Sequence, residues 1–403
     1  MRGLAAAVQQ DLDRRLRSAS PAPIAVALSG GGDSLALALI AADWAHAHGR
    51  RLLILTVDHR LREESAAWTQ ACAATAARLR ADFRALAWEG EKPTTGLPAA
   101  ARAARHRLIA DAAREAGAKV VLMGHTASDR LEAVAMRDTG STTPSPRAWG
   151  PSPAWPEGRG VFLLRPMLTQ TRADIRAWLA GRGETWIEDP ANEDHSFARA
   201  RARARMSGGE TDDLAPPRDL ADLARATTDL AGGLAVPRSA LQDAPGAFLA
   251  AACLCAAGTA RPPRADALAR LAEALRGDAP LVATLAGSRI EADDSQVRFL
   301  RDAGRRGVAP LTLAAGETGV WDGRFEINTD RDVTIQPLTG HAAGLPAAQR
   351  ADLKRLPAGA RGTLPFIVSA GSPVIGAIPG VSSRPLALDR LRAACGLVEG
   401  EPA

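Results

Sequence analysis

A glycine-rich segment near the start of the sequence has the residue types that bind phosphate. It consists of Ser29, Gly30, Gly31, Gly32, Asp33 and Ser34. An apolar run, 24–28, precedes it, and a run of helix-forming residues, 35–48, follows it. A turn from a strand into a helix directs several backbone N–H groups toward one point, where they can hold a phosphate. We therefore predict a phosphate-binding loop, with a plain glycine turn as the alternative.

The loop differs from the common P-loop because no Gly-Lys-Ser/Thr ending follows the glycines. Asp33 stands instead where the phosphates are expected to lie. A carboxylate there repels bare phosphate unless a Mg²⁺ ion bridges the two groups. Asp33 is thus a predicted metal ligand as well as a member of the loop.

Three more polar residues, His125, Asp129 and Glu132, recur at helical spacing after another apolar run. If the segment is helical, all three project from one face. Two carboxylates and an imidazole on one face can hold Mg²⁺ and orient a reactant, and Asp129 is the second predicted metal ligand. A solvated helix face is the alternative interpretation.

Basic residues gather in two places that could contact phosphate. The segment 58–62, Asp-His-Arg-Leu-Arg, begins with Asp58 and could line an adenine pocket. Arg102, Arg105 and Arg107 lie near the start of a predicted helix, and arginine is well suited to bidentate phosphate contacts. A charged surface loop and a solvated basic stripe are the respective alternatives.

A tract of alternating alanine and arginine contains Arg199, Arg201, Arg203 and Arg205 with no acid between them. This local positive charge suits the phosphate backbone of a nucleic acid. The alternative is a solvated linker.

Strands and helices alternate through the first half of the chain. We expect strands at 24–28, 51–57, 83–88, 119–123 and 161–165, and helices at 34–48, 64–80, 99–116, 127–136 and 172–181. This order is typical of an α/β fold with a doubly wound parallel sheet. Ligands bind such sheets at the carboxyl ends of the strands, so the loops 29–34, 58–62 and 124–128 should converge there.

The second half contains no evident chemical motif, and we expect smaller domains in it. The predicted divisions are a catalytic domain at 1–206, a linker at 207–218, a mainly helical domain at 219–300 and a small α+β domain at 301–403. Leu and Ala at helical spacing indicate helix from 219 to about 276. A hairpin is expected from 284–290 and 296–300, and short strands at 319–327, 364–368 and 374–378.

Composition limits the protein class. The 403 residues carry a formal net charge of +5, which is compatible with nucleic-acid binding. The four cysteines are scattered without a C-x-x-C pair, which argues against a zinc or iron–sulfur site. No apolar run reaches membrane-spanning length, and 1–17 is more typical of an amphipathic helix than of a signal peptide. We expect a cytoplasmic protein with no membrane partner.

These motifs, in this order, resemble those of the tRNA(Ile)-lysidine synthetase family, whose PP-loop domain belongs to the N-type ATP pyrophosphatases (adenine nucleotide alpha-hydrolase-like). Besides the glycine loop, the matching residues are Asp58, His59, Leu61, Arg62, Ala101, Arg102, Arg105, 165–168, Arg172, Trp186, 188–190, Asn192, Phe197, Arg199 and Arg203. The family's G-H-H-x-D-D-Q-x-E-T stretch is altered at 124–133, although His125, Asp129 and Glu132 remain. Ala200 replaces an asparagine of the last motif.

The resemblance implies an ATP-dependent ligase that acts on isoleucine tRNA with a CAU anticodon. ATP would adenylate the wobble cytidine and release pyrophosphate, after which free L-lysine would displace AMP. The implied cofactors are ATP and Mg²⁺. The glycine loop would grip pyrophosphate and Asp58 would contact the nucleotide.

The same resemblance implies roles at the reacting atoms. Asp33 would help hold Mg²⁺, and Asp129 and Glu132 would lie at the cytidine, metal and lysine centre. His125 and Arg105 would orient phosphate or developing charge. Arg102 and the arginine tract would bind tRNA. Whether Glu132 or Asp129 receives the lysine ammonium stays open.

Two alternatives remain beside this interpretation. One is another PP-loop, ATP-dependent tRNA-modifying enzyme, although tRNA thiolation would need a C-x-x-C pair or a nucleophilic cysteine. The other is a binding module that holds ATP or tRNA without turnover. A homodimer is one assembly that the sequence allows.

Overall fold

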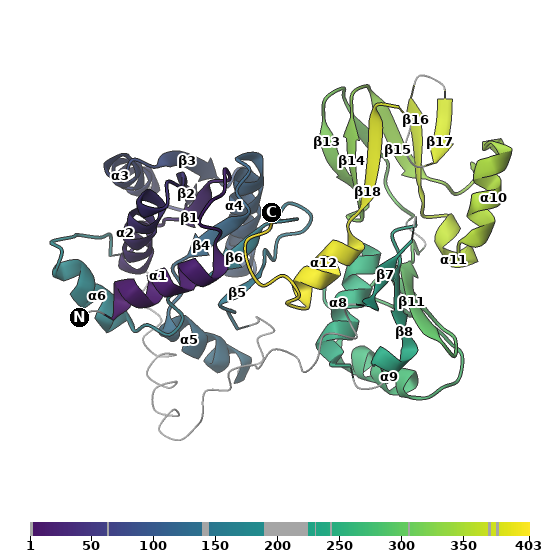
Figure 1. Cartoon of the computed structure of the whole chain (residues 1–403), viewed down its shortest axis with the longest axis horizontal. Coiled ribbons are helices and arrows are strands. Elements are labelled where there is room, and N and C mark those ends of the chain that lie inside the picture. The colour runs from purple at the N-terminus through teal and green to yellow at the C-terminus, as the bar shows by residue number, and fades with distance from the viewer. Residues whose placement is uncertain are drawn as a thin grey trace. The chain divides into compact units, whose positions relative to one another are not determined.

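The computed structural model places the chain in two compact units, Met1–Asp213 with Val398–Ala403, and Leu214–Leu397 (Figure 1). The structure describes residues 3–62, 64–138, 145–188, 225–229, 231–241, 244–304, 307–369, 372–375 and 379–403. The predicted linker 207–218 and the arginine tract 199–205 lie outside these ranges. The last six residues group with unit 1 and not with 301–397.

Unit 1 is built on a six-stranded sheet with the order β3-β2-β1-β4-β6-β5. The strands are β1 (Ile24–Ala27), β2 (Leu52–Asp58), β3 (Asp82–Ala87), β4 (Val120–Met123), β5 (Trp149–Pro151) and β6 (Phe162–Leu164). All neighbouring pairs are parallel except β5 with β6, which is antiparallel. The predicted parallel α/β sheet is therefore confirmed.

Helices cover both faces of this sheet (Figure 1). They are α1 (Leu4–Arg15), α2 (Gly32–Ala47), α3 (Ser65–Arg78), α4 (Leu97–Glu115), α5 (Ala127–Asp138) and α6 (Arg172–Ala180). Strand side chains alternate between two cores, as a doubly wound sheet requires. Val26 is in register with Ile54 and Leu122, and all three pack in the core that contains α2. Their neighbours on the opposite face share a second core with Ile109 of α4.

A buried ion pair attaches the last six residues to unit 1. The Arg50 guanidinium donates to both carboxylate oxygens of Glu401, with Nη2–Oε1 at 2.8 Å and Nη1–Oε2 at 3.1 Å. Both side chains are 1% exposed. The backbone N–H groups complete the arrangement, since Arg17 donates to the Glu401 carboxylate and Glu401 donates to the Arg15 carbonyl. Trp149 Nε1 also donates to the Val398 carbonyl at 2.6 Å.

We predict that Glu401→Ala lowers the free energy of unfolding of unit 1 by about 3–5 kcal/mol, because it leaves the buried Arg50 charge without its partner. Chemical denaturation followed by tryptophan fluorescence measures this. The control is Asp82→Ala, which breaks the pair of Arg51 and Asp82, whose side chains are 68% and 54% exposed. The control should change stability by less than about 1 kcal/mol. Equal losses in the two variants would contradict a structural role for the buried pair.

Unit 2 begins with a five-stranded antiparallel sheet with the order β7-β8-β11-β10-β9. Its strands are β7 (Thr227–Thr228), β8 (Leu234–Pro237), β9 (Leu281–Leu285), β10 (Ser288–Ala292) and β11 (Gln296–Arg301). The 3₁₀ helix η3 (Arg238–Leu241) follows β8. Residues of α8 (Gly246–Ala257), α9 (Ala265–Arg276) and α12 (Ala387–Ala394) share one core with this sheet.

The rest of unit 2 contains two small antiparallel sheets, β12-β15-β16-β17 and β13-β14-β18. Their strands are β12 (Leu311–Leu313), β13 (Thr318–Trp321), β14 (Phe325–Thr329), β15 (Val333–Pro337), β16 (Pro365–Ser369), β17 (Ser372–Ile375) and β18 (Val381–Pro385). The helices η4 (Ala342–Gly344), α10 (Ala347–Arg355) and α11 (Ala358–Arg361) lie between β15 and β16 in the chain.

Three expectations for unit 2 are corrected. The helix expected from 219 to about 276 is wrong at β8, where Leu234 and Val236 are buried and alternate with half-buried residues. Pairing with β11 stabilises this strand against its helical propensity. The strand expected at 284–290 is interrupted by a turn with positive φ at Ala286 and Gly287. The strand expected at 319–327 is a hairpin of β13 and β14.

Within the described ranges, no helix has both the length and the apolar character needed to cross a bilayer.

Candidate active site

The glycine loop joins β1 to α2 and is closed by its own serines. Ser34 Oγ donates to the Gly31 carbonyl at 2.9 Å and accepts from the Ser29 N–H at 3.2 Å. The two hydroxyl oxygens are 3.1 Å apart. Gly31 is the N-cap of α2, so the first N–H groups of the helix have no partner inside the helix. The loop thus has the form of an anion cradle.

Gly30 is the position in the loop that requires glycine. Its φ is +85°, and an added Cβ would lie 2.5 Å from Cδ1 of Ile187. The Ile187 N–H donates to the Gly30 carbonyl at 3.0 Å. A segment far along the chain therefore braces the loop from outside, a contact that the sequence motifs did not reveal.

The carboxylates predicted for catalysis come together beside this loop. Asp33 on α2 and both Asp129 and Glu132 on α5 face one guanidinium, that of Arg172. The Arg172 Nε–Asp33 Oδ2 distance is 3.1 Å, whereas Nη2–Asp129 Oδ1 and Nη1–Glu132 Oε1 are 3.7 and 3.8 Å. We refer to Asp33, Asp129 and Glu132 as the carboxylate cluster.

Local contacts fix Asp129 within the carboxylate cluster. Asp129 Oδ2 accepts hydrogen bonds from the Thr126 N–H at 2.7 Å and from Thr126 Oγ1 at 2.9 Å. Its Oδ1 is the atom that faces Arg172. Burial raises the pKa of Asp33, and the positive charge of Arg172 opposes that shift. The Arg172 guanidinium thus offsets part of the cost of holding two acids, Asp33 and Asp129, close together.

A basic cluster lies next to the acids and contains Arg102, Arg105, His125 and Arg165. Arg165 Nε donates to His125 Nδ1 at 3.0 Å, so the neutral imidazole carries its proton on Nε2. Burial lowers the pKa of His125 to about 3, and the charge of Arg165 adds to the shift. His125 is therefore a neutral hydrogen-bond donor at physiological pH.

Arg105 retains donor capacity within this cluster. Its Nε is buried and has no hydrogen-bond partner among the residues that the structure describes. Burial lowers the Arg105 pKa to about 10, with repulsion from Arg102 adding to the shift and Asp129 opposing it. A desolvated guanidinium with an unused donor is a suitable partner for an anionic oxygen.

The loop after β2 contributes at the same edge of the sheet, since β1 and β2 are parallel neighbours. Asp58 Oδ1 accepts from the Arg60 N–H at 2.7 Å, which shapes the turn. Burial lowers the pKa of His59, and the charge of Arg105 adds to this shift, which places His59 within electrostatic reach of the basic cluster.

The predicted residues thus have three outcomes. The structure brings most of them to one edge of the sheet, namely the glycine loop, Asp33, Asp129, Glu132, His125, Arg105 and Arg102. Asp58 lies at the same edge, where it accepts from the Arg60 N–H. Arg199, Arg201, Arg203 and Arg205 lie outside the described residues. Their functional roles stay predictions.

Sequence reasoning assigned no site role to Arg165 or Arg172. Both follow β6, a fourth strand that ends at this edge. The polar residues after that strand were the available signal, because any loop leaving a parallel strand reaches the ligand side of the sheet.

The site fits a magnesium ion by the chemistry of its donors. Among the described residues, no group of three His, Cys, Asp or Glu side chains lies close enough to hold a metal. Mg²⁺ in nucleotide sites usually takes one or two carboxylates and completes its shell with phosphates and water. Asp33 and Asp129 can supply those carboxylates.

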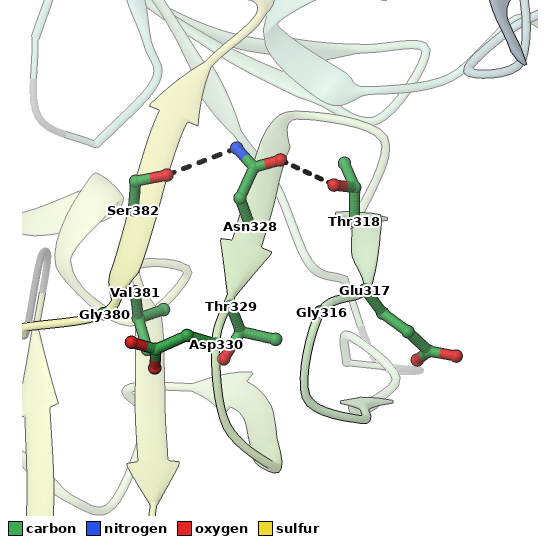
Figure 2. Close-up of a pocket in the computed structure, with 9 residues that line it drawn as sticks. All are labelled: Gly316, Glu317, Thr318, Asn328, Thr329, Asp330, Gly380, Val381 and Ser382. Atoms are coloured by element: carbon green, nitrogen blue, oxygen red, sulfur yellow. Dashed lines mark hydrogen bonds between the residues drawn. The ribbon is translucent and has the colours of Figure 1, made fainter.

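An open hollow in unit 2 has a different lining from the site in unit 1 (Figure 2). Its volume is about 440 Å³, and its lining includes Glu317, Asn328, Asp330 and Ser382. Asn328 accepts from Thr318 Oγ1 at 2.6 Å and donates to Ser382 Oγ at 3.2 Å. The charged side chains of the lining are acidic, so the hollow is poorly suited to phosphate.

Comparison with known proteins agrees with this geometry. A PP-loop domain family matches residues 4–208. The parallel sheet, glycine loop and carboxylate cluster therefore define a PP-loop protein. The tRNA(Ile)-lysidine synthase of Caulobacter vibrioides is 49% identical over 408 residues, which cover 98% of this chain and 98% of that protein. That of Rhizobium meliloti is 34% identical over 339 residues, covering 77% and 74%. This chain belongs to the tRNA(Ile)-lysidine synthase family.

We predict that Gly30→Ala lowers the free energy of unfolding by about 1–3 kcal/mol, because alanine is strained at this positive φ and its Cβ collides with Ile187. The matched control is Gly31→Ala, whose added Cβ meets nothing nearer than 3.8 Å and whose φ is negative. Denaturant unfolding compares the two variants. Similar stability in both would show that Ile187 does not brace the loop.

Proposed function

We propose that this chain ligates free L-lysine to the wobble cytidine of isoleucine tRNA with a CAU anticodon and consumes ATP. The observation that carries the proposal is the near full-length similarity to tRNA(Ile)-lysidine synthases, together with a PP-loop beside a carboxylate cluster. In the first step the ring carbonyl oxygen of cytidine attacks the α-phosphorus and pyrophosphate leaves. In the second step the lysine ε-amine attacks the ring carbon, loses a proton, and AMP departs with the oxygen.

The chain's own groups divide these tasks by charge. Backbone N–H groups of the glycine loop hold the pyrophosphate. Asp33 and Asp129 hold Mg²⁺, which when bound neutralises charge on the leaving group. Arg105 supplies the buried donor and His125 the neutral Nε2–H for phosphate oxygens. Asp129 or Glu132 receives the lysine ammonium and keeps the amine near the adenylated carbon.

Thiol chemistry finds no support in the structure. All four cysteines are buried. Burial raises the pKa of Cys72, the cysteine nearest the glycine loop, and raises that of Cys253 and Cys255 to about 12. A buried thiol that resists ionisation is a poor nucleophile. Ligation therefore accounts for the site better than tRNA thiolation does.

ATP, lysine and tRNA are substrates of the cytoplasm, so we propose that the enzyme acts there. A homodimer stays a prediction that a mass measurement in solution tests.

The proposal is tested by incubating the purified chain with ATP, L-lysine and a CAU-anticodon isoleucine tRNA. Lysidine should be found by nucleoside mass spectrometry, with AMP and pyrophosphate formed in equal amounts. Exchange of labelled pyrophosphate into ATP should depend on tRNA. Binding of ATP and tRNA without exchange or AMP would favour the non-catalytic alternative.

We predict that Asp33→Asn reduces tRNA-dependent AMP release by about 10²-fold or more, because a carboxylate that would hold the Mg²⁺ neutralising the phosphates is lost. The control is Asp43→Asn on the same helix, since Asp43 pairs only loosely with Arg182 at 3.7 Å and is 55% exposed. Circular dichroism checks the fold of both variants. Normal turnover by Asp33→Asn would remove this residue from the mechanism.

We also predict that replacing Arg199, Arg201, Arg203 and Arg205 by glutamine weakens tRNA binding. Each lost phosphate contact makes the dependence of log K on log salt shallower, so the slope should fall by roughly 3. Filter binding at several salt concentrations measures it, and ATP binding serves as the control. An unchanged slope would assign the tract to a solvated linker.

A further inference from the structure

Arg172 has an unusual position for a structural arginine. Each of its three guanidinium nitrogens faces a different member of the carboxylate cluster, as the distances of 3.1, 3.7 and 3.8 Å show. It comes from the start of α6, whereas the acids lie on α2 and α5. Three acids at one point repel one another, so a cation there lowers their mutual repulsion.

The contacts of Arg172 are loose in comparison with those of Arg50. Arg50 and Glu401 are 1% exposed and joined by two short hydrogen bonds. Arg172 is 29% exposed and makes one hydrogen bond to the carboxylate cluster, since its other two contacts exceed hydrogen-bond length. The first arrangement is closed to water and structural. The second can exchange with solvent and with other cations.

The backbone at Arg172 is anchored independently of its side chain. Thr171 is the N-cap of α6, and its Oγ1 accepts from the Asp174 N–H at 3.2 Å. Departure of the guanidinium from the acids therefore needs only side-chain rotation and no shift of the helix. Arginine can then contact phosphate oxygens in a bidentate way.

We propose that the Arg172 guanidinium occupies the metal-binding position of the carboxylate cluster until a divalent metal binds together with the nucleotide. In the nucleotide-free protein it competes with the metal for Asp33 and Asp129. When phosphates enter, the guanidinium moves to them and leaves Asp33 and Asp129 to bind the metal. Metal and nucleotide binding are thereby linked, because each favours the same position of Arg172. The identity of the nucleotide rests on the proposed function, whereas the competition for the acids does not.

The test measures Mn²⁺ binding to the full chain without nucleotide or tRNA, using the electron paramagnetic resonance signal of free Mn²⁺. Arg172→Gln should bind Mn²⁺ about tenfold more tightly than the unmodified protein, because the competing charge is gone. The matched control is Arg182→Gln. It also removes one positive charge from unit 1, but from a side chain that pairs with Asp43. The control should leave Mn²⁺ affinity unchanged.

A second variant locates the gained affinity. Arg172→Gln combined with Asp129→Asn should lose the gain, because an acid of the cluster is removed. Arg172→Lys should show a smaller gain than Arg172→Gln, since an ammonium lacks the fork that faces three acids. Circular dichroism establishes that each variant is folded, and Arg172→Lys carries the test if Arg172→Gln does not fold.

Three results would overturn the proposal: unchanged or weaker Mn²⁺ binding in the folded variant, a gain that survives Asp129→Asn, or a gain in affinity for L-lysine with none for Mn²⁺. A gain for L-lysine alone would show that this position binds the substrate ammonium and not a metal. Failure of the proposed function is distinguishable, because absence of lysidine formation leaves the Mn²⁺ result as it stands.

Discussion

Charge balance at the ligand edge of the parallel sheet controls the arrangement of this site. Asp33, Asp129 and Glu132 are held near one another by two helices, and their like charges need a cation between them. Arg172 supplies it in the protein alone. The rest of unit 1 serves to keep these side chains at one edge, since α2 and α5 each begin just after a parallel strand, β1 and β4.

The site has an acidic half and a basic half in contact through Asp129, whose charge acts on Arg105, His125 and Arg165. The acidic half suits cations such as Mg²⁺ and an ammonium group, and the basic half suits phosphate. A reaction between ATP, a polyanionic tRNA and a cationic amino acid needs both. The acidic half is partly exposed, since the side chains of the carboxylate cluster and Arg172 are 24–29% exposed, whereas the pair of Arg50 and Glu401, which stabilises the fold, is fully buried.

The sequence by itself determined the local features. Strand and helix periodicity in the first half predicted the parallel sheet, and the strand-end rule placed the glycine loop, Asp129 and Glu132 at one edge. Such features depend on neighbours within a few residues or on the general geometry of parallel sheets. The family motifs then led to the same assignment that the Caulobacter vibrioides relative, matched over 98% of this chain, supports.

Only the tertiary structure decided which distant residues complete these features. Arg172 is 139 residues from Asp33, and Glu401 is 351 residues from Arg50, so no local pattern links them. The strand β8 forms because β11 pairs with it across the chain, against a local preference for helix. Long-range contacts of this kind depend on chain topology and burial, whose energies a single sequence does not display.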